Sequence, residues 1–83
     1  MCKEEQCRAL LWLITQRAIT IGEYLAWEYH FVDEQSEAEV ADQLNDDGHQ
    51  PPGNCLEWNQ TNVSRALKRV CEHLREMLDP GHA

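Results

Sequence analysis

The sequence predicts an all-α protein, a small bundle of three to four helices with an extended loop before the last helix. Apolar residues recur with helical spacing in several segments, and no segment alternates as strongly in the manner of a strand. A Ser or Thr stands three residues before a Glu at two places, which is typical of a helix start. The 83 residues are 42% hydrophobic and have room for one core, so we expect a single domain over residues 1–83.

Two helices are expected in the first part of the chain. The first covers about residues 3–17. Its apolar stripe consists of Cys7, Leu10, Leu11 and Ile14. A second helix begins after Thr20, because Thr20 and Glu23 have the spacing of a capping box. No proline separates the two helices, so one fused helix with its weak point at Gly22 is the alternative.

Two more helices are expected in the second part. The third begins at Ser36, three residues before Glu39, and ends at Gly48. Two prolines and two glycines in "DDGHQPPGN" exclude a helix from the following loop. The fourth covers about residues 61–78 and has the clearest apolar stripe. That stripe consists of Val63, Ala66, Leu67, Val70, Cys71, Leu74 and Leu78.

Charge is distributed unevenly along the chain. The net charge is −8, which is unfavourable for a nucleic-acid binder taken as a whole. No Lys or Arg occurs between Arg17 and Arg65, whereas ten Asp and Glu residues do. Four of the seven basic residues belong to the last helix: Arg65, Lys68, Arg69 and Arg75. The sequence therefore predicts an acidic middle and one basic helix.

Several classes of protein are not favoured. The longest apolar run, "ALLWLI", is far shorter than the roughly 20 residues of a membrane span, and it lacks the flanks of a signal peptide. We therefore expect a soluble, cytoplasmic protein whose four cysteines are reduced. The Cys and His spacings match no zinc signature, and no nucleophile, base and oxyanion donors can be assembled. We expect no metal, no cofactor and no enzymatic activity.

Polar residues around the start of the fourth helix could read DNA. Asn and Gln match the hydrogen-bonding edge of adenine, and Arg and Lys match that of guanine or contact phosphate. The candidate DNA-binding residues are Asn59, Gln60, Thr61, Asn62, Ser64, Arg65, Lys68 and Arg69. The alternative interpretation is that the asparagines only cap the helix and that the basic residues form a solvated face.

Two parts of the sequence resemble known DNA-binding families. "SEAEVADQL" followed by "VSRALKRVCEHLREML" resembles the helix-turn-helix of sigma-factor region 4. "VADQLNDDGHQPPGNCLEWNQTNVSRAL" is similar to the DNA-binding module of serine recombinases. The matching positions are Ala41, Leu44, Asn45, Gly48, Gly53, Trp58, Val63 and Leu67. These resemblances imply a helix-turn-helix core over about residues 20–79, with Trp58 anchoring the loop. They also imply that Ser64, Arg65, Lys68 and Arg69 face DNA.

The expected function is that of a small transcriptional regulator that binds double-stranded DNA through its last helix. The second interpretation is an acidic helical interaction module, such as an inhibitor or DNA mimic of phage or mobile-element origin, that binds a basic protein. We also expect a homodimer. Trp12, Leu13 and Trp27 exceed the apolar surface that a four-helix monomer of this size readily buries.

Overall fold

The computed structural model describes residues 3–78, which form four α-helices and no strand. The helices are α1 (Lys3–Thr15), α2 (Ile21–Phe31), α3 (Glu37–Asp46) and α4 (Gln60–Leu78). The predicted small all-α bundle is therefore confirmed. The first two helices are separate, so the alternative of one fused helix is wrong.

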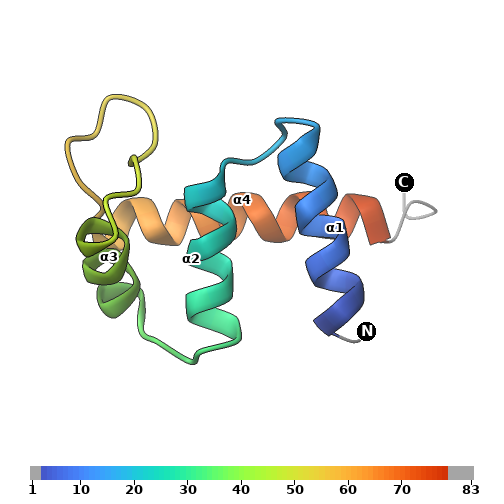
Figure 1. Cartoon of the computed structure of the whole chain (residues 1–83), viewed down its shortest axis with the longest axis horizontal. Helices are drawn as coiled ribbons and strands as arrows, with labels where there is room; N and C mark the ends of the chain where they lie inside the picture. The colour runs from blue at the N-terminus through green and yellow to red at the C-terminus, as the bar shows by residue number, and fades with distance from the viewer. Residues whose placement is uncertain (1–2, 79–83) are drawn as a thin grey trace.

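Helix α4 is the helix on which the other three pack. Figure 1 shows α1, α2 and α3 standing next to one another along α4, each crossing it. Helix α4 contacts all three, and α2 contacts both α1 and α3. Within residues 3–78, α1 and α3 do not contact each other, so α2 and α4 both join the two ends of the row. The core lies between α4 and this row of helices.

The buried face of α4 follows the predicted stripe except at its end. Its buried apolar residues are Val63, Ala66, Leu67, Val70 and Leu74. Cys71 was expected in the stripe but is exposed, whereas the neighbouring Val70 and Leu74 are buried. The side chain of Leu78 lies outside the described residues.

The expected dimer-forming surplus of apolar residues is smaller than the sequence predicts. Leu13 and Trp27 are buried within the monomer, at 6% and 4% exposure. Helix α1 turns Leu10 and Leu13 towards the core, whereas Leu11, which was expected in its stripe, points outwards. Of the three residues in that argument, Trp12 alone stays exposed, at 53%. The bundle thus encloses most of its large apolar side chains without a partner.

Both predicted capping boxes are confirmed. At α2, the Thr20 hydroxyl accepts from the Glu23 N–H at 3.1 Å, and the Thr20 N–H donates to Glu23 Oε1 at 2.9 Å. Ser36 and Glu39 make the same reciprocal pair at the start of α3. Each box satisfies two backbone donors that a helix start leaves without partners.

Two helices end in Schellman turns. At α1, the Arg17 N–H donates to the Ile14 carbonyl and the Ala18 N–H to the Leu13 carbonyl, with Arg17 at φ 61°. Gly48, at φ 75°, has the equivalent place after α3. A non-glycine residue in this left-handed conformation carries a steric penalty, which Arg17 bears and Gly48 avoids. The turn at Arg17 is what separates α1 from α2.

Trp58 holds the connection between α3 and α4, residues 47–59, against the bundle. Its side chain is 2% exposed, and its indole N–H donates to the His49 carbonyl at 3.0 Å. The Asn45 side chain bonds both the N–H and the carbonyl of Trp58, at 2.8 and 2.9 Å. The indole also lies against Gly22 of α2, where an added Cβ would be 2.7 Å from a ring carbon. Trp58 thus ties this connection to both α2 and α3.

The contact between Gly22 and Trp58 predicts whether a substitution at Gly22 stabilises or destabilises the protein. In a free helix, Gly→Ala stabilises by about 0.5–1 kcal/mol. Here we expect Gly22→Ala to lower the free energy of unfolding by about 1–3 kcal/mol, because the new methyl overlaps a buried ring. Urea denaturation followed by circular dichroism measures the change, and a stabilised variant would contradict the close packing.

A tyrosine links α2 to the end of α3. The Tyr29 hydroxyl donates to Asp47 Oδ2 at 2.9 Å, and the Gln43 amide donates to the same carboxylate at 3.2 Å. The hydrogen bond from Tyr29, followed by that from Gln43, lowers the pKa of Asp47 below its ordinary value. Burial, followed by the bond to Asp47, raises the pKa of Tyr29. The hydrogen bond between Tyr29 and Asp47 is therefore strongest at pH values above the pKa of Asp47 and below the pKa of Tyr29.

We expect Tyr29→Phe to raise the pKa of Asp47 in an NMR acid titration, because the hydrogen bond that lowers this pKa most is lost. Since the folded pKa of Asp47 is depressed, its contribution to stability is present above the unfolded pKa and disappears as pH falls through the folded pKa. The stability difference between wild type and variant should therefore narrow in acid. Tyr24→Phe, on the same helix without a bond to Asp47, is the control and should leave that pKa in place.

Candidate nucleic-acid interface

The first half of α4 turns a polar face to solvent. The exposed residues of this face are Gln60, Thr61, Ser64, Arg65 and Lys68, which we call the reader face. The opposite side of the same turns is buried through Val63, Ala66 and Leu67, so α4 is fixed and the reader face points outwards. Across residues 3–78, no side chain of the reader face is held by a hydrogen bond or an ion pair. Five of the eight predicted DNA-binding residues thus lie together on one free surface.

Asn59 and Asn62 have a structural role at the start of α4. The Asn59 side-chain oxygen accepts from the Asn62 N–H at 2.9 Å, and the Asn62 oxygen accepts from the Asn59 N–H at 2.8 Å. The Asn62 amide also donates to the Glu57 carbonyl at 3.0 Å, and the residue is 4% exposed. Asn62, which was predicted to contact DNA, is therefore buried in a cap. Asn59 remains exposed, but its oxygen is used by the same cap.

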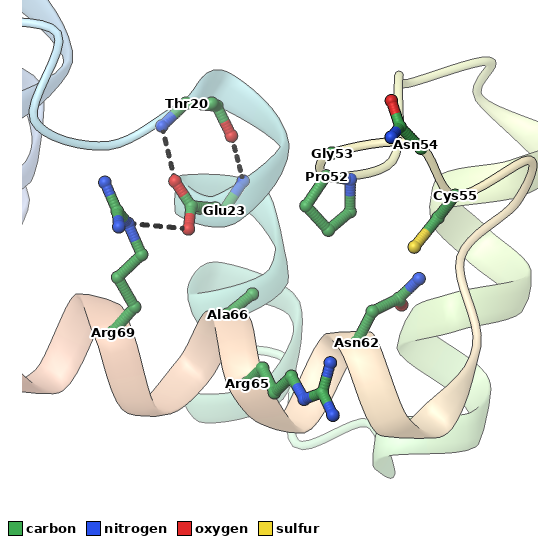
Figure 2. A pocket seen from close by; sticks show the side chains of 10 residues that line it. All are labelled: Thr20, Glu23, Pro52, Gly53, Asn54, Cys55, Asn62, Arg65, Ala66 and Arg69. Atoms are coloured by element: carbon green, nitrogen blue, oxygen red, sulfur yellow. Dashed lines mark hydrogen bonds and ion pairs between the residues drawn. The ribbon is translucent and has the colours of Figure 1, made fainter.

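Arg69 is also held by the protein itself. Figure 2 shows its guanidinium reaching Glu23 on α2, and Nε lies 3.1 Å from Glu23 Oε2. A terminal guanidinium nitrogen donates to the Ala18 carbonyl at 2.8 Å. Glu23 is buried and uses its other oxygen in the capping box with Thr20. Arg69, which was predicted to face DNA, is therefore paired with a buried carboxylate, although its side chain stays 56% exposed.

A pocket of about 490 Å³ lies beside the reader face. Figure 2 shows residues 52–55 of the connection on one side and Asn62 and Arg65 of α4 on the other, with Glu23 and Arg69 at the far end. Arg65 also lines a second hollow with Glu37 of α3. Arg65 therefore stands on the ridge between two hollows, and no ion pair within the described part of the chain restrains it.

Sequence reasoning missed the second role of Glu23. The capping-box spacing identifies Glu23 as a cap, but its ion pair joins residues far apart in the sequence. The one available signal was compositional: Arg69 occurs on the only strongly basic helix, and Glu23 is the first acid of the acidic middle. Which carboxylate would meet which cation depends on how α2 crosses α4, and local patterns do not contain that information.

The remaining features of the described chain are few. Cys7, Cys55 and Cys71 are free thiols, and no group of three or more potential metal ligands gathers within residues 3–78. None of the helices there has both the length and the apolar character of a membrane span. Comparison with known protein families, curated proteins and solved structures finds no match to this chain.

The Glu23–Arg69 pair should contribute to stability through the buried carboxylate. We expect Arg69→Ala to lower the free energy of unfolding by about 1–3 kcal/mol, because Glu23 would keep its burial and lose its charged partner. The neighbouring cation provides the control, since Lys68→Ala changes an exposed side chain without a partner and should stay within about 0.5 kcal/mol. Equal effects of both substitutions in a denaturant titration would contradict the role assigned to Arg69.

Proposed function

We propose that the protein is a small DNA-binding regulator of the helix-turn-helix type and that the reader face of α4 enters the major groove. The observation that carries the proposal is the free, solvent-facing set of amide, hydroxyl and basic side chains on the first half of a rigidly packed helix. Helices that enter the major groove contact the base edges with side chains near the helix N-terminus. Bidentate donors such as Arg65 recognise guanine, and Gln60 matches adenine.

The start of α4 is also suited to phosphate. The cap occupies the Asn62 N–H, whereas the N–H groups of Gln60 and Thr61 lie in the first turn and have no acceptor within residues 3–78. Free N–H groups and the positive end of the helix dipole favour an anion there. Lys68 lies further along the same face and adds a mobile charge for the DNA backbone.

The acidic remainder of the molecule shapes this binding. With a net charge of −8, the protein repels DNA at long range, so affinity depends on the few contacts of the reader face. Because Arg69 is neutralised by Glu23, the number of cations available is small. A binder that neutralises about two phosphates should show a salt dependence of log K of about −2, far shallower than that of strongly basic regulators.

Selection of bound sequences from a randomised duplex library tests the proposal. The wild type should enrich a short motif. Arg65→Ala should weaken binding to the enriched duplex by about 1–3 kcal/mol and relax the preference at one base pair. Lys68→Ala should weaken all duplexes alike and reduce the salt slope by about 1 in fluorescence anisotropy titrations.

Arg75→Ala is the matched control. Arg75 is an exposed cation of the same helix, but it lies in the last turn, seven residues beyond Lys68, the last residue of the reader face. Its removal should leave both the motif and the affinity near those of the wild type. The proposal is overturned if no motif is enriched, or if Arg75→Ala weakens binding as much as Arg65→Ala does.

The exposed side of α3 supports a second candidate function. Glu39, Asp42 and Asp46 are exposed, and α3 carries no Lys or Arg. An acidic face of this kind is complementary to a basic protein surface and would steer such a partner towards it. Under this alternative, duplex DNA is not retained at any salt concentration, while a basic partner protein is, and Asp42→Lys weakens its retention.

A further inference from the structure

Two large apolar side chains stand next to each other on the outer side of α1. Leu11 and Trp12 are 54% and 53% exposed. The other exposed large apolar residues, Ile21, Phe31 and Leu56, belong to other elements. Adjacent exposed apolar residues, rimmed by charge, are a feature of association surfaces, whereas single ones are ordinary. The outer side of α1 is therefore the strongest candidate for a contact with another molecule.

Charges are ordered along this side of α1. Glu4 and Glu5 lie in its first turn, Arg8 one turn later, then Leu11 and Trp12, and Arg17 two residues after the helix ends. All of these side chains are exposed, and none forms an ion pair within the described residues. The face thus runs from negative to positive along the helix, in the direction of the chain.

This order is complementary to itself when two copies of α1 run in opposite directions. Placing Arg8 of one copy beside Trp12 of the second permits a cation–π contact on each side of the two-fold axis. The same register brings Arg17 to the first turn of the second copy, where Glu4 and Glu5 outnumber the one cation, Lys3. A parallel arrangement would instead place like charges together. Two-fold interfaces use one self-complementary patch in this way.

We propose that the exposed face of α1 is a dimer interface and that its occupant is a second copy of this chain, bound antiparallel. Leu11 and Trp12 form the apolar centre, and Arg17 pairs with Glu4 and Glu5 at each end. The proposal is independent of DNA binding, because α1 contacts α4 through the opposite face. Its test therefore contains no DNA.

Sedimentation equilibrium of the full chain under reducing conditions measures the association. The wild type should show a concentration-dependent monomer–dimer equilibrium, and Trp12→Ser should raise the dimer Kd at least about tenfold. Leu56→Ser is the matched control, because Leu56 is 99% exposed in the connection before α4 and should have no effect on the Kd. Circular dichroism verifies that each variant is folded.

Charge reversal tests the antiparallel register. The double variant E4K/E5K and the single variant R17E should each raise the dimer Kd, because both ends of either homodimer then carry like charges. An equimolar mixture of the two should associate as tightly as the wild type, since the reversed charges meet opposite partners. R17G should also weaken the dimer while raising monomer stability, because glycine relieves the left-handed turn.

Three results would overturn the proposal. They are a wild type that is monomeric at every concentration, a dimer weakened by Leu56→Ser but not by Trp12→Ser, and a mixture of the reversed variants that associates no better than either alone.

Discussion

The arrangement of the bundle depends on how Trp58 is enclosed. The Trp58 indole lies against Gly22 of α2 and donates to the His49 carbonyl. The backbone N–H and carbonyl of Trp58 are both hydrogen-bonded by the Asn45 side chain of α3. Trp58 directly precedes the cap that starts α4. The direction in which α4 leaves the connection, and hence the direction of the reader face, is therefore set by a buried indole rather than by the loop's own stiffness.

A second constraint fixes the middle of α4. Glu23 serves the start of α2 with one carboxylate oxygen and Arg69 with the other. The same guanidinium also holds the Ala18 carbonyl in the turn after α1. One ion pair thus aligns three elements, and it neutralises a cation whose side chain stays 56% exposed. Because Arg69 is neutralised, Arg65 and Lys68 are the two cations of the reader face that have no ion-pair partner within residues 3–78.

Local rules predicted much of this fold, because capping and amphipathic spacing act within a few residues. The boxes at Thr20 and Ser36 and the buried face of α4 follow directly from the sequence. The error at Leu11 arose because α1 carries apolar residues on more than one side, and its packing against α2 and α4 decides which of them are buried. Asn62 and Arg69 were assigned to DNA because amide and guanidinium side chains suit such contacts. The burial of Asn62 and the ion pair of Arg69 depend on packing that these local patterns do not describe.

Helix α4 is uninterrupted over 19 residues, from the reader face at one end of the bundle to its contact with α1 towards the other (Figure 1). At 1.5 Å per residue it is a stiff strut of about 28 Å. A pair of chains joined at their α1 helices would hold their two reading ends at a set separation. Such a dimer would bind two recognition elements separated by a fixed number of base pairs. It would bind the same elements more weakly when one base pair is inserted between them.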